Sequence, residues 1–301
     1  MKKQKVRFIV NPKSGGTFGS RFTERMVKRN LDLNRFSYDM YYTRYAGHAI
    51  KLAQQSLIDK VDIIAVVGGD GTQNEVGQVI MDKNVLMANI PTGSGNANAR
   101  TLGIPLHIPD AIQLINTGKP FPIDALMING QASFMASGIG YDGLVIDRFQ
   151  KLPLRGVASY MASILSTALT YELPDFTIQI DDQAPFSRKA FTVLITSMGA
   201  VGFGIKFNHI SKPNDGIFEI TVINEFNKVR IPEIIRESFF GDVASADFME
   251  TFQVHKKLKL SLNKVESLQM DGDFHGRTDS IEVTLKKQAL RYIVPQDFDI
   301  N

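Results

Sequence analysis

Three glycines and an aspartate follow the apolar run Asp62 to Val67. In Gly68-Gly69-Asp70-Gly71-Thr72 the backbone can come close to a ligand, because glycine has no side chain and adopts positive φ. A helix expected after this loop would direct free N–H groups toward it, which favours phosphate. Asp70 would repel phosphate unless Mg²⁺ lay between them, directly or through water. The residues also allow a plain strand-to-helix turn with Asp70 as a cap.

Two further loops have a similar design. Thr92-Gly93-Ser94-Gly95-Asn96 follows the apolar segment 85–91, and Asn11-Pro12-Lys13-Ser14-Gly15-Gly16 follows the apolar segment 5–10. The carboxyl ends of parallel strands meet at one edge of a sheet, where open α/β sheets bind ligands. These loops therefore predict a phosphate or nucleotide site. The sequence has no Walker A pattern, and the G-x-G-x-x-G match at 138–143 has no visible βαβ unit around it, so we do not interpret it as a dinucleotide fingerprint.

The elements that would position these loops alternate between strand and helix. We expect strands at 5–10, 37–43, 62–69 and 85–91, helices at 21–31 (with Ser20 as N-cap), 45–58 and 72–81, and two more helices around Pro105 and Pro109. This order predicts a parallel α/β sheet. After Pro120-Phe121-Pro122 strands dominate, which predicts an antiparallel sandwich or barrel. Its expected strands are 124–130, 132–138, 176–182, 190–198, 216–224, 252–262 and 280–287, with helices near 157–171 and 230–240; the strand 289–295 is left unplaced.

Composition limits the function classes. A chain of 301 residues with 44% hydrophobic residues is long enough for two domains. Its net charge of +3 does not indicate nucleic-acid binding but suits an anionic membrane surface. Without cysteine there is no thiol nucleophile, and no apolar run reaches the ~18 residues of a membrane span. We expect a cytoplasmic protein that contacts the membrane transiently. The sequence leaves the oligomeric state open, a homodimer included.

The motifs resemble those of the diacylglycerol-kinase catalytic-domain family, which includes bacterial lipid kinases and sphingosine kinases. The resemblance covers nearly the whole chain and rests on Asn11 to Gly15, Thr43 with Gly47-His48-Ala49, Gly68 to Val76, Gly138-x-Gly140-x-Asp142, Asp215-Gly216 with Phe218, and Asp271-Gly272-Asp273. It implies an α/β nucleotide-binding domain, similar to those of phosphofructokinases and NAD kinases, in residues 1–124 plus 288–301. It also implies an all-β sandwich lipid-binding domain in residues 125–287, with the active site in the cleft between the domains.

The resemblance further implies ATP and Mg²⁺ as cofactors and a small lipid as substrate. Asp271 would be the general base, the alternative being a type I Asp-Gly turn between strands. Asp70 would organise Mg²⁺, and Asp142 would hold the lipid's polar head, with helix capping as its alternative and Asp147 as its rival. The expected nucleotide-binding residues are Asn11, Ser14, Gly15, Thr43, Gly68, Gly69, Gly71, Thr72, Glu75, Gly93, Ser94, Gly95 and Asn96.

The acceptor lipid and the basic group at the γ-phosphate stay open. Residues 91–99 resemble the sphingosine-kinase form P-x-G-S-G-N-A-x-A more than the P-x-G-T-x-N-D-F-A of bacterial diacylglycerol kinases, so a sphingoid base competes with diacylglycerol. Candidates for the basic group are Arg148, Lys151 and Arg155, which equally suit a solvated face. Two rival functions are an NAD kinase-like enzyme acting on a soluble substrate and a non-catalytic regulator that binds nucleotide and lipid.

Overall fold

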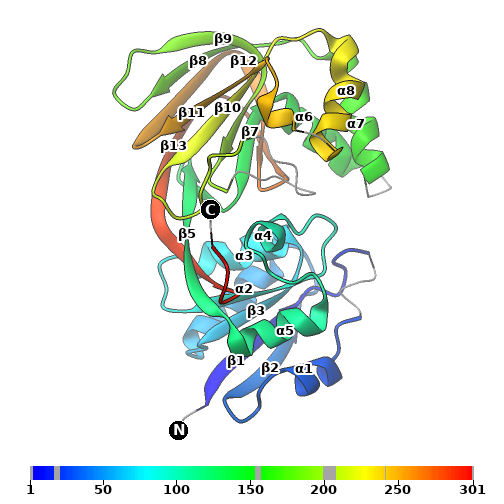
Figure 1. Ribbon diagram of the computed structural model, residues 1–301, viewed down its shortest axis with the longest axis vertical. Helices are drawn as coiled ribbons and strands as arrows, with labels where there is room; N and C mark the ends of the chain where they lie inside the picture. Colours follow the sequence, from blue (N-terminus) through cyan, green and yellow to red (C-terminus); the bar gives the residue numbers. More distant parts are fainter. Residues whose placement is uncertain (1–2, 17–20, 153–156, 199–207, 241, 300–301) are drawn as a thin grey trace. The chain divides into compact units, whose positions relative to one another are not determined.

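The computed structural model describes residues 3–16, 21–152, 157–198, 208–240 and 242–299. Their contacts divide the chain into two compact units (Figure 1). Among the described residues, unit 1 contains those up to Asp124 and from Lys287 onward, and unit 2 contains Ala125 to Lys286. Strands β5 (Lys119–Ile128) and β13 (Asp273–Val294) each cross a unit boundary, so the chain passes between the units within strands.

Unit 1 contains a parallel sheet in the order β2-β1-β3-β4, with the end of β13 beside β4. Its other strands are β1 (Gln4–Val10), β2 (Phe36–Tyr42), β3 (Ile63–Gly68) and β4 (Leu86–Pro91). Every residue of β3 is buried, as expected for a parallel strand covered on both faces. The strand at 289–295 is now placed, because Tyr292 of β13 pairs in parallel with Met87 of β4.

Four of the helices described in unit 1 form two pairs, α2 beside α3 and α1 beside α5 (Figure 1). Their bounds are Glu24–Asn30 for α1, His48–Ile58 for α2, Asp70–Ile80 for α3, Ala97–Thr101 for α4 and Ile108–Thr117 for α5. Helices α1 and α2 begin three residues later than predicted. For α1 the cap position is Thr23, and the predicted cap Ser20 lies outside the described residues. For α2 the delay reflects Gly47, whose φ of 81° ends the preceding loop.

Unit 2 is built on antiparallel strands in the order β11-β10-β9-β7-β12-β13, with β8 joining β9 and β12 and with β5 pairing β6. Its strands are β6 (Gln131–Ser133), β7 (Ala136–Gly140), β8 (Asp175–Ile180), β9 (Phe186–Thr196), β10 (Phe218–Asn224), β11 (Met249–Val254) and β12 (Lys257–Met270). Their inward-facing apolar side chains form one core cluster that includes Phe176, Val193, Ile220 and Leu260. The predicted strand-rich second unit is confirmed.

Three strand predictions in unit 2 were wrong. The predicted strand 132–138 is divided between β6 and β7 at Phe134 and Met135, whose amides donate to Asp271. The predicted strand 252–262 is split between β11 and β12 at His255 and Lys256. The carboxylate of Asp181 causes this break, because it accepts hydrogen bonds from the amides of residues 255, 256 and 257 at 3.1, 2.7 and 2.9 Å. The predicted strands 280–287 and 289–295 form one strand, β13, in which Gln288 has a φ of 51°.

In the part of unit 2 that the structure describes there are three α-helices, where two were expected. Helices α7 (Val157–Thr170) and α8 (Ile231–Phe240) match the predictions, whereas α6 (Tyr141–Lys151) was missed. A glycine inside it, Gly143, weakens its helical signal. A Cβ at Gly143 would lie 2.2 Å from the carbonyl oxygen of Ser267 on β12, so this glycine lets α6 pack closely on β12. Among the described residues, no helix combines the length and apolar character needed to cross a membrane.

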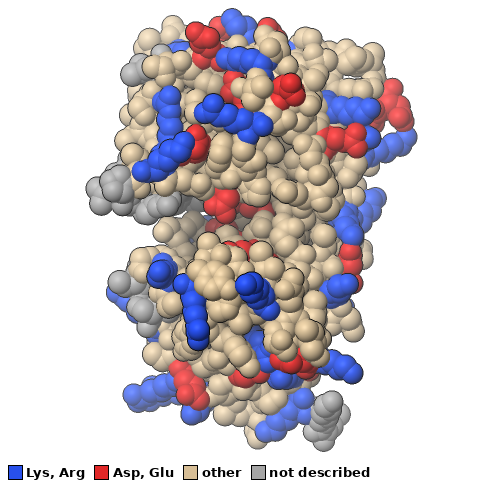
Figure 2. Space-filling model, turned by 180° about the vertical axis from the view of Figure 1, so that it is seen from behind, with Lys and Arg blue, Asp and Glu red and all other residues tan. Residues whose placement is uncertain are grey.

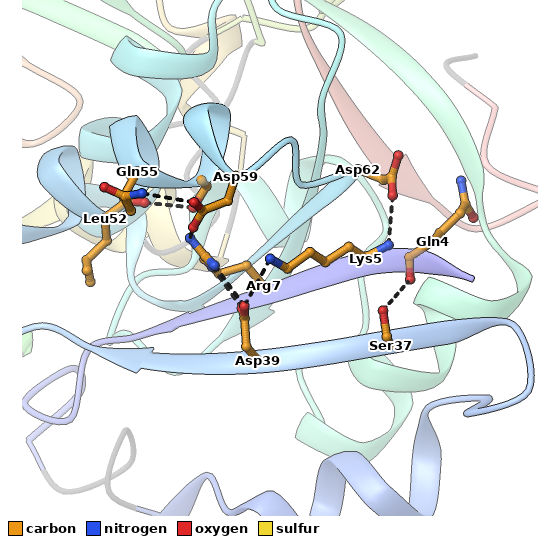
Figure 3. A network of polar contacts seen from close by, with 10 residues as sticks. Gln4, Lys5, Arg7, Ser37, Asp39, Leu52, Gln55, Asp59 and Asp62 are labelled. Atoms are coloured by element: carbon orange, nitrogen blue, oxygen red, sulfur yellow. Dashed lines mark hydrogen bonds and ion pairs between the residues drawn. The ribbon is translucent and has the colours of Figure 1, made fainter. Parts of the chain in front are cut away.

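A buried arginine ties the first elements of unit 1 together (Figure 3). Arg7 on β1 is 2% exposed and donates from Nε and Nη2 to the two oxygens of Asp39 on β2, at 2.8 and 2.7 Å. Its Nη1 donates to Asp59 Oδ2 at the end of α2, at 2.7 Å. The guanidinium also lies over the ring of Tyr41, 4.4 Å from its centroid. The hydrogen bond from Arg7, with one from Gln55, holds the pKa of the Asp59 carboxyl below its usual value.

We expect Arg7→Ala to lower the free energy of unfolding by about 2–3 kcal/mol, because it leaves two carboxylates without their shared cation. The loss should not be larger, since Asp39 and Asp59 are 29% and 30% exposed and keep part of their hydration. Urea denaturation would measure the change. The control Lys28→Ala removes an exposed pair with Glu24 and should change stability by less than about 0.5 kcal/mol. Equal losses in the two variants would contradict the assignment.

Candidate functional site: a nucleotide pocket in unit 1 and an aspartate turn in unit 2

A cavity of about 390 Å³ lies in unit 1, where β1, β2 and β3 end. The residues that follow these three strands, Asn11, Thr43 and Gly69, all line it. This is the carboxyl edge of the parallel sheet, the place where the sequence predicted a ligand site. The cavity brings together seven of the predicted nucleotide-binding residues: Asn11, Ser14, Thr43, Gly69, Gly71, Thr72 and Glu75.

Hydrogen bonds between the loops fix the shape of this cavity. The amide of Asn11 donates to the carbonyl of Val67 on β3 at 2.8 Å, and that of Thr43 donates to the carbonyl of Val10 at 2.8 Å. The side chain of Asn11 donates to Thr72 Oγ1 at 3.0 Å. The loop after β1 is therefore held to the first turn of α3 rather than left to solvent.

Glu75 braces the loop that precedes α2. Its Oε1 accepts a hydrogen bond from the amide of Gly47 at 2.8 Å, and its Oε2 accepts one from the amide of Ala49 at 3.1 Å. A carboxylate at a helix N-terminus satisfies amides that have no partner inside the helix and interacts favourably with the helix dipole. The structure thus shows Glu75 in a bracing role, while a direct contact with nucleotide stays a prediction.

Sequence reasoning missed four residues that line the cavity: Lys13, Arg44, Tyr45 and Ala46. Lys13 lies between Asn11 and Ser14, and the other three lie between Thr43 and Gly47, at positions that the recognised motifs leave unspecified. The motifs therefore indicated the segments that line the cavity, but not these side chains. Lys13 and Arg44 are the basic groups of this cavity. Next to them, the ring of His48 stacks on Tyr45, and its Nδ1 accepts a hydrogen bond from the amide of Arg44 at 3.1 Å.

Of the basic residues considered from sequence for the γ-phosphate, those that the structure describes belong to unit 2, and their contact with nucleotide stays a prediction. Arg148 and Lys151 are on α6 of unit 2, where Arg148 donates to Thr167 at 3.2 Å and Lys151 pairs with Asp147 at 2.7 Å. Arg155 lies outside the described residues. On the face drawn in Figure 2, Lys and Arg side chains are interspersed with Asp and Glu, in keeping with the small net charge.

The second glycine loop meets the first at Gly93. A Cβ at Gly93 would lie 2.5 Å from the Cα of Gly69, so the two backbones come this close only because residue 93 is glycine. Asn96 closes its own loop, since its Oδ1 accepts from the amide of Gly93 at 2.9 Å and its Nδ2 donates to the carbonyl of Gly93 at 2.8 Å. Residue 68 must be glycine for a similar reason, because a Cβ there would lie 2.7 Å from the Cβ of Thr72.

The remaining predicted residues of unit 1 do not line the cavity. Gly15 has a φ of 59° in the turn after β1, and Ser94 is exposed at the tip of the second loop. The carbonyl of Gly95 accepts a hydrogen bond from Arg100 Nε at 3.2 Å. A contact between these three residues and nucleotide stays a prediction.

Asp70 is the first residue of α3, but its carboxylate caps a different helix, α4. Its Oδ2 accepts a hydrogen bond from the amide of Ala97 at 3.1 Å, and its Oδ1 accepts one from the amide of Asn98 at 3.2 Å, at the start of α4. A carboxylate offers about four acceptor positions, so this cap is compatible with a magnesium ion or its water ligands at the same group. The described residues contain no cluster of three or more His, Asp or Glu side chains that could hold a metal by themselves.

Two buried polar atoms lie near this cap. Thr92 Oγ1 and Asn98 Oδ1 have no hydrogen-bond partner among the described protein atoms. Buried groups of this kind need water or a ligand to satisfy them. The surroundings of Asp70 therefore suit a polar, hydrated ligand such as a nucleotide phosphate with its metal.

In unit 2, Asp271 lies at the tip of the hairpin between β12 and β13. Asp271 and Gly272 have φ values of 50° and 84°, and Met270 pairs with Asp273 across the turn. Positive φ at both central residues is the signature of a type I′ turn. The Asp-Gly turn considered from sequence is thus present, but as type I′ instead of type I, and the strand after it starts at Asp273, not at 280.

The carboxylate of Asp271 is fixed by the segment between β6 and β7. Its Oδ1 accepts hydrogen bonds from Ser133 Oγ at 2.7 Å and from the amides of Met135 and Ala136 at 2.9 and 3.3 Å. Its Oδ2 accepts one from the amide of Phe134 at 2.8 Å. The group therefore has one defined orientation, which a catalytic carboxylate requires, and its role as a base stays a prediction.

Asp142 lies in the first turn of α6, and its carboxylate turns back into unit 2. It makes a short hydrogen bond with Thr192 Oγ1, and its Oδ2 accepts one from Gln269 Nε2 at 3.0 Å. Desolvation raises the pKa of the Asp142 carboxyl, and the bonds from Thr192 and Gln269 offset part of this effect. Both oxygens thus have partners within the protein, and a contact with a lipid stays a prediction. The rival Asp147 is buried and pairs with Lys151.

The raised pKa of Asp142 predicts a pH-dependent effect of Asp142→Asn on stability. Above the ordinary aspartate pKa of about 3.9, the folded wild type retains a proton that the unfolded chain releases. Its stability therefore falls as pH rises toward the folded-state pKa, by at most about 1.4 kcal/mol per pH unit from this group. The Asn variant lacks this titration, so its stability relative to wild type should increase with pH. Urea unfolding between pH 4.5 and 8 measures this, and parallel curves would contradict it.

Comparisons with known proteins agree with this arrangement. Residues 5–128 match the diacylglycerol kinase catalytic domain, and residues 136–294 match the YegS C-terminal NAD kinase beta sandwich-like domain. The diacylglycerol kinase of Bacillus subtilis (strain 168) is 24% identical over 299 residues, covering 98% of this chain and 97% of the relative.

Solved structures show the same fold. A diacylglycerol kinase from Bacillus anthracis strain Sterne has a TM-score of 0.74 at 22% identity, covering 99% of this chain and 100% of that one. Yeast NADH kinase, solved with NADH, has a TM-score of 0.50 at 12% identity, covering 98% and 84%. With both domain models matched in order along nearly its whole length, the chain belongs to the diacylglycerol kinase family of lipid kinases.

Proposed function

We propose that this protein is an ATP- and Mg²⁺-dependent lipid kinase that phosphorylates the hydroxyl of diacylglycerol or a related lipid. The observation that carries the proposal is the cavity in unit 1, where three strand ends place a glycine loop, two basic side chains and the start of α3 together. Family membership supports the reaction class. The lipid comes from a bilayer, so the proposal includes transient contact with a membrane surface.

ATP would bind with its phosphates at the start of α3. No side chain caps this helix at Gly69, and the free amides and positive dipole end of a helix N-terminus favour phosphate. Gly69 and Gly71 let the phosphates approach the backbone, and Thr72 adds a hydroxyl. Lys13 and Arg44 would offset the phosphate charge. Residues of the second glycine loop are expected to contact the phosphates across the close approach of Gly93 to Gly69.

Asp70 would hold Mg²⁺, directly or through its water ligands. Magnesium held there would supply positive charge to offset the negative charge of the β- and γ-phosphates. The cap that Asp70 forms on α4 fixes the direction of its carboxylate, so the group meets the ligand without first having to be ordered.

In unit 2, Asp271 would act as general base. The lipid hydroxyl oxygen forms a bond to the γ-phosphorus, the bond to the bridging oxygen of ADP breaks, and the hydroxyl proton passes to the carboxylate of Asp271. The four hydrogen bonds from residues 133–136 hold this carboxylate in place before the substrate arrives. Such prior ordering lowers the entropy cost of reaching the transition state.

An NAD kinase-like activity on a soluble substrate is the alternative, because the fold of yeast NADH kinase matches over nearly the whole chain. A regulator that binds nucleotide and lipid without catalysis is a further alternative. We favour the lipid kinase because the catalytic-domain model that matches unit 1 is that of diacylglycerol kinases.

The acceptor can be identified by following label from γ-labelled ATP with Mg²⁺. Separate micelles would contain diacylglycerol, sphingosine, ceramide or monoacylglycerol, and NAD would serve as the soluble acceptor. We expect label in one lipid and none in NAD. Label in NAD without lipid would establish the soluble-substrate alternative, and no transfer despite ATP binding would favour the regulator.

Asp271→Asn should reduce turnover by at least about 10³-fold, because the amide cannot take up the hydroxyl proton. ATP affinity, measured by calorimetry, should be unchanged, since the nucleotide cavity lies in unit 1. Asp279→Asn, an exposed residue on the same hairpin, is the matched control and should retain turnover within about twofold. Turnover of Asp271→Asn close to wild type would refute the assignment of the base.

A further inference from the structure

The motif Gly138-x-Gly140-x-Asp142 has an unusual close contact at its centre. A Cβ at Gly138 would lie 1.9 Å from Oδ2 of Asp142, so the aspartate occupies the space that a side chain at 138 would need. Gly140, with a φ of 116°, turns β7 into α6 and brings Asp142 back over the strand. The spacing of the motif is what allows a carboxylate from α6 to reach across β7.

The carboxylate of Asp142 reaches Gln269 on β12. Gln269 pairs with Gly138 in the antiparallel ladder between β12 and β7, and its Nε2 donates to Asp142 Oδ2 at 3.0 Å. Its Oε1 accepts a hydrogen bond from the amide of Gly272 at 3.0 Å. Gly272 follows Asp271 in the type I′ turn. A continuous path of hydrogen bonds thus joins Asp142 to the turn that carries the proposed base.

The far end of this path is anchored in the sheet. Thr192 Oγ1 on β9 lies within hydrogen-bond distance of both Asp142 Oδ1 and the carbonyl of Ile139, the latter at 3.0 Å. A threonine hydroxyl has a single proton, so it can donate to only one of them. If Asp142 carries a proton, it donates to Thr192, Thr192 donates to Ile139, and every group has a partner. An asparagine at 142 would reproduce this arrangement through its NH₂ group.

A second path reaches the carboxylate of Asp271 itself. Ser137 Oγ, on β7 beside Gly138, donates to Ser133 Oγ at 3.0 Å, and Ser133 Oγ donates to Asp271 Oδ1 at 2.7 Å. Two separate paths therefore support the base, one from α6 through β12 and one from β7. One path holds the backbone of the turn and the other holds the side chain.

We propose that Asp142 is a positioning residue, which acts through Gln269 on the Asp271-Gly272 turn, and not a ligand of the lipid's polar head. The proposal rests on the proposed function, because it needs Asp271 to be the base. Asp271 is a non-glycine residue at positive φ, a conformation that the surrounding bonds must maintain. Loss of the bond to Gly272 would let the turn relax, and small displacements of a catalytic group are costly to the rate.

Gln269→Leu is the direct test, because leucine has a similar size but can neither donate nor accept. We expect kcat to fall at least tenfold, with KM for ATP unchanged within twofold. Asp142→Leu should behave in the same way, and Asp142→Asn should restore most of the activity. The double variant Asp142→Leu/Gln269→Leu should be no slower than the slower single variant, since both break one path.

Thr221→Val is the matched control for loss of a buried polar group. Thr221 lies on β10 of the same unit, is fully buried and shares a hydrogen bond with Thr251 at 3.1 Å, outside the path. Its kcat should stay within twofold of wild type. Amide hydrogen exchange at Gly272 gives a readout besides activity, and it should accelerate in Gln269→Leu and Asp142→Leu but not in Asp142→Asn.

Folded Gln269→Leu with wild-type kcat and unchanged exchange at Gly272 would overturn the proposal. So would a double variant whose loss equals the product of the two single losses, or an Asp142→Asn variant as slow as Asp142→Leu. These outcomes are distinct from failure of the proposed function. If Asp271→Asn retains turnover, the base assignment fails; if it abolishes turnover while Gln269→Leu does not reduce it, only the positioning role fails.

Discussion

Backbone amides in loops must find hydrogen-bond partners, and around the proposed site carboxylates accept from several amides that no backbone carbonyl satisfies. Glu75 accepts from the start of α2, Asp70 from the start of α4, and Asp271 from the segment before β7. Asp181 orders the turn between β11 and β12, and Asp124 accepts from the amide of Gln288 at 2.7 Å, where β13 enters unit 1. The loops that would bind substrate are therefore ordered by acidic side chains together with the backbone and asparagine hydrogen bonds described above.

This device links the chemistry to the fold. Asp70 and Asp271 are the residues proposed to meet the metal and the lipid hydroxyl, and each is also fixed by the amides it accepts. A carboxylate that has several amide donors has little freedom to rotate, so its remaining acceptor positions point in set directions. The same bonds that complete a loop thus orient a reactive group, and changing the aspartate affects both properties. Replacing the aspartate by asparagine in one variant and by leucine in another separates the role in completing the loop from the role in the reaction.

The motif glycines matter for the room they leave to neighbouring atoms as much as for their backbone conformation. Gly93 lets two loops touch, Gly68 makes room for Thr72, and Gly138 makes room for Asp142. In each case the missing Cβ is replaced by a neighbouring group of the protein. The G-x-G-x-x-G match at 138–143 shows this well, because its first and last glycines are filled by Asp142 and by the backbone of Ser267.

The sequence by itself determined the elements whose signals are local. The continuous apolar run of β3, the glycine loops that follow the strands and the change to strand-rich sequence after Pro122 predicted both parts of the fold, and the loops predicted where the cavity lies. Only the tertiary structure decided which groups each side chain meets. Gln269, the amide donors of Asp271 and the cap between Asp70 and α4 join residues that are far apart in the chain, and no local pattern encodes such pairs. The split at His255 and the helix at Tyr141 were missed for the same reason, because Asp181 and the close packing of Gly143 on Ser267 override the local preference.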